Sequence, residues 1–263
     1  MYLAIDIGGT KTLVALFSKH GRCLSRTKFL TNQNPDNFLS DLCHYIEPFR
    51  HKNITQIVIA VPGIVNNDYS VSPQNLPSWH NINIQETIKN LFTCPIHVLN
   101  DADLATIYET QKYSDIAIYL TFSTGIGGGI AKNGKILPES ATFEPGHYIY
   151  ELPNGTKSEW EDLAAASAIN RKFDCQVTDL KTKNSIETVA YYMSLGLNSI
   201  VAQYHPSVII IGGPISKIFK QLKPRLLSYL EPSPITPLPH LMPAKKPFES
   251  VIYGCYLYAK SQK

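Results

Sequence analysis

The sequence predicts an α/β fold built from two similar halves. Its 263 residues suffice for one large domain or two smaller ones. Apolar runs typical of buried strands alternate with helical patterns over about the first hundred residues. A strand, a glycine-rich stretch and a second strand occur near residue 8 and again near residue 125. This repetition predicts an internal duplication, with residues 1–110 plus a C-terminal helix at 248–263 as a smaller N-terminal lobe and residues 111–247 as a larger one.

Composition narrows the class of protein. A hydrophobic content of 44% and a charged content of 17% are globular values, and the net charge of +3 gives nucleic-acid binding no support. No apolar run approaches the roughly 20 residues that span a bilayer, and the opening strand does not resemble a signal peptide. The five cysteines contain no Cys-x-x-Cys pair. We therefore expect a cytoplasmic protein without a membrane or nucleic-acid partner.

The elements of the first half follow from apolar patterns and the residues that interrupt them. Tyr2–Ile7 is an apolar run that ends at a glycine pair, as a buried strand does. Pro35 begins a helical pattern, and Gln56–Val61 is the continuous β-branched run of a covered parallel strand. The other elements expected are strands at Thr12–Ser18, Arg22–Leu30 and Ile96–Leu99, and helices at Ile84–Phe92 and from Asp101 to about Thr110.

The second half begins with the same arrangement and then becomes mainly helical. Ile116–Thr121 is predicted as a strand, Gly125–Gly129 as a glycine turn, and Ile130-Ala131 as the start of the return strand. Residues 137–158 lack periodicity and contain several prolines, so we expect mainly loop there. After a final strand and a proline-rich segment, the chain ends in a helical pattern. The remaining elements expected are helices at Glu159–Phe173, Ser185–Tyr204 and Ser250–Ala259, and a strand at Val208–Ile211.

The most informative motif is Asp6-Ile-Gly-Gly-Thr-Lys11, directly after the first strand. Gly8-Gly9 permits a turn whose backbone N–H groups face an anion. Asp6 would anchor a phosphate-bound Mg²⁺, through water, while Thr10 and Lys11 add a hydroxyl and a cation. Taken alone, this motif is equally compatible with an ordinary glycine hairpin.

Two further glycine-rich stretches follow apolar strands, one around Gly125 and one at Gly212-Gly213. Three such turns indicate a nucleotide held between two lobes, because phosphoryl transfer needs backbone donors and a metal around the phosphates. Gly212-Gly213 would let the chain pass close to a base or ribose. Each turn alone is also explained as a tight turn. The residues expected at the phosphates on this second side are Thr124, Gly125, Gly127 and Gly128.

Polar side chains for a second substrate occur at three places. Asn100-Asp101 ends a strand, where open α/β sheets bind ligands, and Asp101 can act as a general base there. Helix capping alone is the simpler explanation for that carboxylate. Glu144, His147 and Glu161 can together hold vicinal hydroxyls of a sugar, although a surface loop explains each separately. Asn75 lies in a polar loop with Trp79 that suits either binding or an edge connection.

Together these motifs resemble the ROK family, which groups bacterial sugar kinases, sugar-sensing repressors and relatives. The resemblance extends from the first residues to at least Gly213 and keeps the order of the family's motifs. It implies a two-lobed, actin-like ATPase (ribonuclease H-like) fold with duplicated mixed β-sheet domains. The segments that carry it are Asp6–Lys11, Val61–Val65, Asn75 with Trp79, Asn100–Ala102, Ser123–Gly129, Glu144–His147 and Ile211–Gly213.

The resemblance also implies roles. Asp101 would be the base that acts on the 6-hydroxyl of a hexose, and ATP and Mg²⁺ would be the cofactors. The family forms homodimers, so a homodimer is expected. The residues expected to orient the sugar are Asn75, Asn100, Glu144, His147 and Glu161.

Two departures from the family matter. Most members bind a structural zinc with the histidine equivalent to His147 and a cysteine cluster, but here no cysteine occurs between Cys94 and Cys175. Because a zinc site needs three or four ligands at close spacing, we predict no zinc site. Repressor members carry a helix-turn-helix domain before the first motif, which here starts at residue 5. We therefore expect an ATP-dependent hexose kinase, with glucose as the first choice of substrate.

Two alternatives stay open. One is a kinase for another sugar, such as N-acetylmannosamine, N-acetylglucosamine or fructose, because pocket shape decides this preference. The other is a non-catalytic sugar-binding regulator that has kept the fold. Retention of both Asp6 and Asp101 favours catalysis, because a sensor needs no base.

Overall fold

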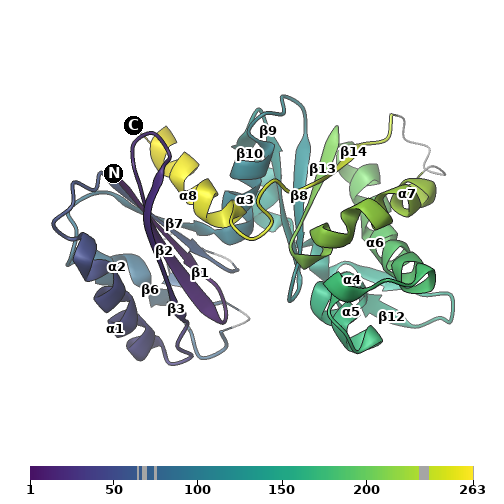
Figure 1. Cartoon of the computed structure of the whole chain (residues 1–263), viewed down its shortest axis with the longest axis horizontal. Helices are drawn as coiled ribbons and strands as arrows, with labels where there is room; N and C mark the ends of the chain where they lie inside the picture. Colours follow the sequence, from purple (N-terminus) through teal and green to yellow (C-terminus); the bar gives the residue numbers. More distant parts are fainter. Residues whose placement is uncertain (64, 67–69, 74–75, 231–236, 263) are drawn as a thin grey trace. The chain divides into compact units, whose positions relative to one another are not determined.

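A computed structural model describes the chain except for residues 64, 67–69, 74–75, 231–236 and 263 (Figure 1). It divides into two compact units. Unit 1 comprises Met1–Tyr108 and Val251–Lys263, and unit 2 comprises Glu109–Ser250. No helix within the described ranges has both the length and the apolar character that a bilayer crossing requires.

Unit 1 is a five-stranded mixed sheet with the order β3-β2-β1-β4-β7. Strands β1, β2 and β3 are antiparallel neighbours, whereas β1, β4 and β7 run parallel. Its elements are β1 (Tyr2–Ile7), β2 (Lys11–Phe17), β3 (Cys23–Leu30), α1 (Pro35–Ile46), β4 (Gln56–Val61), β5 (Ser70–Val71), β6 (Ile82–Asn83), α2 (Ile84–Lys89), β7 (Ile96–Asn100), α3 (Asp101–Thr110) and α8 (Ser250–Ser261), of which α3 and α8 cross the unit boundary.

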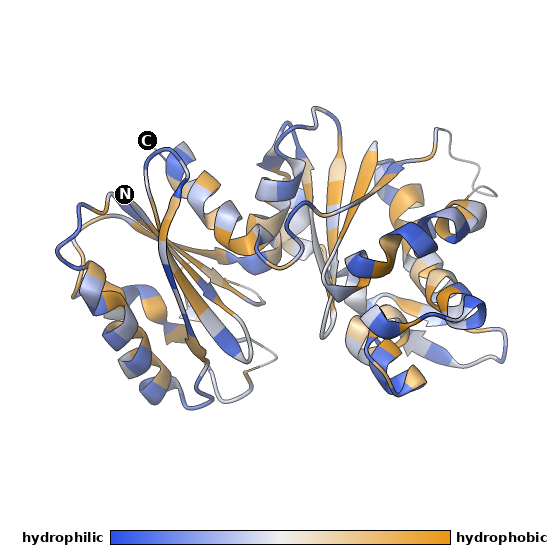
Figure 2. Cartoon of the chain, in the orientation of Figure 1, coloured by the Kyte–Doolittle hydropathy of each residue, from blue (hydrophilic) through white to orange (hydrophobic). Residues whose placement is uncertain are grey.

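Alternation along β1 divides unit 1 into two apolar layers. Leu3, Ile5 and Ile7 pack with α1 and α2 on one face of the sheet. Tyr2 and Ala4 pack with α3 and α8 on the other face. Figure 2 shows both hydrophobic and hydrophilic colours on the strands of this sheet, in keeping with the mainly exposed edge strand β3. A sheet buried on both faces explains why β1 and β4 are almost continuously apolar in sequence.

Unit 2 repeats the sheet of unit 1 in the order β10-β9-β8-β13-β14. Strands β8, β9 and β10 are antiparallel, and β8, β13 and β14 are parallel, as in the first sheet. The predicted α/β fold with duplicated mixed sheets is therefore confirmed. The elements are β8 (Ala117–Phe122), β9 (Ile126–Lys132), β10 (Lys135–Ile136), β11 (Ile149–Glu151), β12 (Lys157–Glu159), α4 (Trp160–Ala164), α5 (Ala166–Phe173), α6 (Lys183–Tyr204), β13 (Val208–Gly212), α7 (Phe219–Leu230) and β14 (His240–Pro243), with single 3₁₀ turns between some of them.

Several predicted boundaries were wrong. The helix expected at Glu159–Phe173 is two helices, α4 and α5, because Ala165 has an extended backbone with ψ of 150°. The expected loop at 137–158 contains the hairpin β11–β12. Helix α7 was not predicted, and it contains Pro224, which removes a backbone donor from the helix interior. Strand β14 lies inside the proline-rich segment, where it pairs with β13 at the sheet edge.

The glycine turn expected at Gly125–Gly129 was also too long. Strand β9 begins at Ile126, so Gly127 and Gly128 pair with β8 opposite Thr121 and Leu120. A Cβ on Gly128 would lie 2.6 Å from the carbonyl oxygen of Tyr119. The close backbone approach requires glycine here, although glycine is disfavoured in strands.

The core of unit 2 is built around Trp160, the first residue of α4. Its side chain is fully buried, and its Nε1–H donates to the carbonyl oxygen of Tyr192 at 2.8 Å. Its ring meets Phe122 edge to face, with centroids 5.4 Å apart. A Cβ on Gly196 of α6 would overlap the Trp160 ring. Helix α6 can therefore approach α4 this closely only because residue 196 is glycine.

This packing generates a prediction for Gly196→Ala. Helix propensity favours alanine by about 1 kcal/mol, but overpacking against a fixed indole ring costs about 1–3 kcal/mol. We expect the cost of overpacking to exceed the gain in helix propensity, so the free energy of unfolding should fall. Urea denaturation measures this change. A variant more stable than wild type would show that the Trp160 ring can move aside.

Candidate active site

The Gly8–Lys11 turn is shaped by hydrogen bonds to its carbonyl groups. Thr31 Oγ1 donates to the Gly8 oxygen at 2.7 Å, and Gln33 Nε2 donates to the Gly9 oxygen at 3.1 Å. In a trans peptide the next residue's N–H points opposite to the carbonyl. The N–H groups of Gly9 and Thr10 therefore point away from Thr31 and Gln33. The Gly8 N–H is used inside the turn, since it donates to Lys11 O at 3.0 Å.

Asp6 and Asp101 lie on the same side of unit 1. Both charges act on the buried thiol of Cys255 in α8, whose pKa is raised mainly by burial and further by these two carboxylates. Tyr2 and Ala4 of β1 face α3 and α8, and Asp6 is the next residue of the strand on that face. Asp101 is the first residue of α3. Burial raises the pKa of Asp6 from 3.8 to about 6, with the positive charge of Lys28 opposing the shift.

Asn100 has hydrogen bonds on both ends of its amide. Its Oδ1 accepts from the Asp103 N–H at 3.1 Å, which caps the start of α3. Its Nδ2 donates to the carbonyl oxygen of Gly63 at 2.9 Å. Asp101 Oδ1 accepts from the N–H of Ala102 at 2.8 Å. Asn100, rather than Asp101, therefore caps the N-terminus of α3. The predicted contact of Asn100 with sugar stays a prediction.

The turn at Ser123–Gly125 in unit 2 is arranged like the first one. Ser167, at the start of α5, donates from its N–H to the Ser123 oxygen at 3.0 Å and from its Oγ to the Thr124 oxygen at 2.5 Å. The N–H groups of Thr124 and Gly125 therefore point away from Ser167. Sequence reasoning missed Thr31 and Ser167, because single hydroxyl residues far along the chain carry no local motif.

The third glycine pair is explained by packing within unit 2. Gly212 ends β13, and a Cβ there would overlap the ring of Tyr119. Gly213 has a φ of 72°, and a Cβ there would overlap the backbone of Phe122. The predicted contact of this pair with adenosine stays a prediction.

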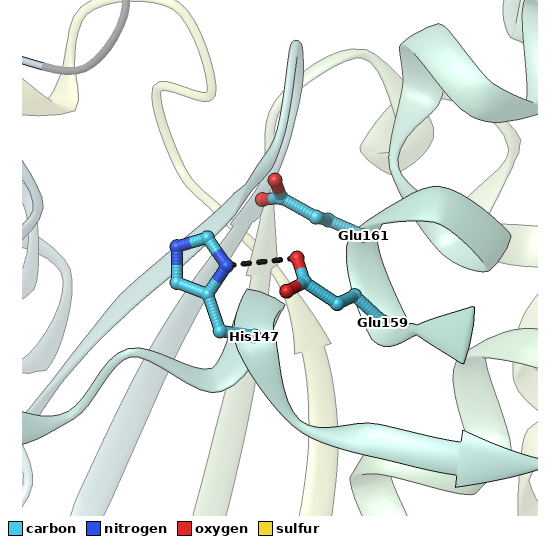
Figure 3. A group of neighbouring side chains, drawn as sticks. All are labelled: His147, Glu159 and Glu161. Carbon is cyan, nitrogen blue, oxygen red and sulfur yellow. Dashed lines mark hydrogen bonds and ion pairs between the residues drawn. The ribbon is translucent and has the colours of Figure 1, made fainter. Parts of the chain in front are cut away.

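His147, Glu159 and Glu161 form a cluster around the β11–β12 hairpin (Figure 3). His147 precedes β11, Glu159 ends β12, and Glu161 lies in the first turn of α4. The Nδ1 atom of His147 lies 2.9 Å from Oε2 of Glu159. Because an ionised carboxylate only accepts, Nδ1 carries the proton in this bond. The structure thus brings the predicted pair His147 and Glu161 together, and it adds Glu159, which sequence reasoning did not identify.

Charge and backbone contacts organise this cluster. The hydrogen bond that His147 donates to Glu159 is the main cause that raises the pKa of His147. Burial opposes this rise, and the charges of Glu161, Glu159 and Glu144 add to it. Glu161 Oε2 accepts from the Ile126 N–H at 3.2 Å, which ties this carboxylate to the start of β9. A Cβ on Gly146 would lie 2.7 Å from that oxygen and 2.6 Å from the carbonyl oxygen of Ile126. Glycine before His147 therefore leaves room for Glu161.

The side chains that could bind a metal fit zinc and Mg²⁺ differently. His147, Glu159 and Glu161 offer ligand atoms within 4.8 Å of one another, the one such group of three or more in the described part of the chain. A structural zinc site is normally closed by four ligands and rich in thiolates, so this open set fits it poorly. Asp6 offers a hard oxygen donor that fits Mg²⁺, and a cation beside it would favour its ionised form.

The sequence places Asn75 and Trp79 in one polar loop. Asn75 lies outside the described residues. Trp79 is 1% exposed and packs on Phe38, with ring centroids 4.5 Å apart. Trp79 therefore belongs to the core of unit 1.

Comparison with known proteins gives a family match over almost the whole chain. The model described as the ROK family matches residues 2–254. The xylose repressor of Bacillus subtilis (strain 168) is 24% identical over 224 residues, which cover 73% of this chain and 58% of that protein. The N-acetylmannosamine kinase of Shigella boydii serotype 18 is 32% identical over 162 residues, which cover 58% of this chain and 55% of that protein. The chain thus spans little more than half the length of these two relatives.

A solved structure supports the fold. The crystal structure of a ROK family glucokinase from Streptomyces griseus, in complex with glucose and AMPPNP, superposes with a TM-score of 0.82. The match covers 99% of both chains at 20% sequence identity. The predicted actin-like fold is confirmed at this level.

The partly buried Asp6 generates a pH prediction for the protein without nucleotide or metal. The carboxyl loses its proton near pH 3.8 when unfolded and at about 6 when folded, so the folded chain holds more protons between these values. The cost of burying its charge therefore grows as the pH rises through that window and is full above it. We expect Asp6→Asn to be more stable than wild type at neutral pH, by on the order of 2 kcal/mol, and equally stable below about pH 4. Thermal denaturation across this pH range measures both. Equal stability at neutral pH would contradict the shift.

Proposed function

The chain belongs to the ROK family, and from that premise we propose that it transfers the γ-phosphoryl group of ATP to the 6-hydroxyl of a hexose. Glucose is the substrate we propose first. The observation that carries the proposal is that the charges of Asp6 and Asp101 both act on the buried Cys255 thiol of unit 1, with Asp6 two residues before the Gly8–Lys11 turn. Phosphoryl transfer needs a base that accepts the proton of the acceptor hydroxyl, and it needs the negative charge of the phosphate to be neutralised. Asp101 would supply the base, and Asp6 would hold the Mg²⁺ that neutralises the charge.

Unit 1 offers the base and one set of phosphate donors. Asp101 would accept the proton of the 6-hydroxyl as the new bond to phosphorus forms. The N–H groups of Gly9 and Thr10, with the Lys11 side chain, would bind phosphate oxygens. Mg²⁺, when bound, neutralises phosphate charge, and Asp6 would hold it through water.

Unit 2 offers the second set of phosphate donors and the sugar contacts. We propose that the N–H groups of Thr124 and Gly125 bind phosphate oxygens. We further propose that Glu144, His147 and Glu161 orient the sugar, because carboxylates accept hydroxyl protons and an imidazole can donate or accept. The two units would then be the two lobes expected from the sequence.

One experiment tests this proposal. Purified protein is incubated with ATP, Mg²⁺ and single sugars: glucose, fructose, N-acetylmannosamine and N-acetylglucosamine. ADP formation and the position of the new phosphate are measured. Phosphorylation at the 6-hydroxyl of glucose is expected. ADP formation with a different sugar would keep the kinase and change its substrate.

A non-catalytic regulator is the second candidate. The observation that favours it is the similarity to a repressor over much of the chain. Sugar binding measured by calorimetry, without ADP formation for any sugar, would support this candidate and overturn the kinase. We also propose a cytoplasmic, homodimeric protein, as the family resemblance implies.

The proposed base generates a kinetic prediction. Asp101→Asn should fold normally, because the amide oxygen can still accept from the Ala102 N–H, and should lower kcat by roughly 10² or more. The matched control is Asp103→Asn, which removes a carboxylate from the same helical turn and should change kcat little. Steady-state kinetics measures both variants. Near-normal turnover in Asp101→Asn would refute the role of Asp101.

A further inference from the structure

The hydrogen bond between His147 and Glu159 has no role in the function described so far. It joins the residue before the β11–β12 hairpin to the residue that ends it. The hairpin register pairs Ile149 with Glu159, which brings His147, two residues earlier, close to the same carboxylate. The side chains of His147 and Glu159 are 40% and 43% exposed, so water reaches both. An exposed pair of this kind contributes little to stability, which leaves its effect on the imidazole to be explained.

The bond determines how the ring is presented. Since Glu159 occupies Nδ1–H, the other ring nitrogen, Nε2, is left for a ligand. Figure 3 shows Nδ1 turned toward Glu159 and Nε2 turned away from both carboxylates. Without Glu159, the ring could rotate about its side-chain bonds, and the neutral form could carry its proton on either nitrogen.

The neighbouring carboxylate is held separately. Glu161 accepts from the backbone N–H of Ile126, on a different element. Trp160, between the two glutamates in sequence, is fully buried and hydrogen-bonded to Tyr192. The buried Trp160 therefore fixes the backbone on both sides of it. Glu161 accepts from the Ile126 N–H, and Glu159 accepts from His147.

We propose that Glu159 is a positioning residue for sugar binding: by accepting from Nδ1–H of His147 it orients the imidazole and keeps Nε2 directed at a sugar hydroxyl. This inference rests on the proposed sugar-binding role of His147. It requires no metal at the cluster, because the carboxylate itself fixes the ring. Glu159 acts through His147 and need not touch the sugar.

The first test is spectroscopic and does not depend on turnover. Long-range ¹H–¹⁵N NMR of the imidazole reports its tautomer and pKa in wild type, Glu159→Gln and Glu159→Ala. Titratable groups facing the ring in the structure are Glu144, Glu159 and Glu161. We expect the Nδ1–H form in neutral wild type, and a His147 pKa lower in both variants. A neutral Nε2–H form in wild type, or an unchanged pKa in both variants, would overturn the proposal.

The second test is kinetic, with a matched control. Glu159→Ala should raise KM for the sugar about tenfold or more and leave KM for ATP within about twofold, since it removes one charged hydrogen bond on the sugar side. Glu159→Gln keeps an acceptor oxygen and should recover part of the loss. Glu151→Gln removes a carboxylate from the same hairpin, 4.0 Å from Lys157, and should behave as wild type. Equal sugar KM values in wild type and Glu159→Ala would overturn the proposal.

The third test measures whether the protein binds zinc. Purified wild type should contain no stoichiometric zinc by mass spectrometry, and a zinc-selective chelator should leave sugar binding unchanged in excess Mg²⁺. Stoichiometric zinc that disappears in Glu159→Ala would overturn the proposal, because a metal would then hold the ring. If wild type phosphorylates no sugar, the proposed function fails, while the NMR experiment and calorimetric sugar binding still decide the role of Glu159.

Discussion

A turn that binds an anion through its backbone must bond its carbonyl oxygens elsewhere, and both glycine turns of this chain meet that constraint. Thr31 and Gln33 bond the carbonyls of the first turn, and Ser167 bonds those of the second. Since carbonyl and following N–H point in opposite directions, these contacts decide where the N–H groups point. Glycine makes each turn sterically possible. The residues that bond the carbonyl oxygens decide in which direction the backbone N–H groups point. The duplicated sheets place such a turn after the first strand of each unit.

A second constraint acts on the cluster of His147, Glu159 and Glu161 in unit 2. Three carboxylates gather near one imidazole, so their mutual repulsion must be offset. Glu161 is stabilised by a backbone donor from β9, and Glu159 by the protonated nitrogen of His147. The buried Trp160 fixes the backbone between them, because its ring packs against α6 at Gly196. Burial of one aromatic ring thus determines where two partly exposed carboxylates lie.

The parts of the fold that sequence predicted are those with local signals. Strands β1, β4 and β8 are apolar runs bounded by turns, and their pairing partners follow from the repeated order. Sequence analysis assigned no element at helix α7, in which packing of Leu222 and Leu226 into the core outweighs the backbone donor that Pro224 removes. Gly127 and Gly128 were assigned to a turn because glycine disfavours strands, but both pair with β8, and the close approach of the Tyr119 carbonyl requires glycine at position 128. For the site, motifs identified His147 and Glu161, while Glu159 depends on a hairpin register that no motif encodes.

Asp6 gives the strongest physical argument between a catalyst and a sensor. Burial raises the pKa of this carboxyl to about 6, so near neutral pH the folded chain carries an ionised group at a cost in stability. Lys28 offsets only part of that cost. A protein that only sensed sugar would gain stability from a neutral residue at position 6, without losing the sugar contacts that we propose on unit 2. A bound divalent cation would turn the same charge into a favourable interaction. The cost of an ionised Asp6, whose charge acts with that of Asp101 on the Cys255 thiol, therefore supports the kinase that we propose rather than the regulator.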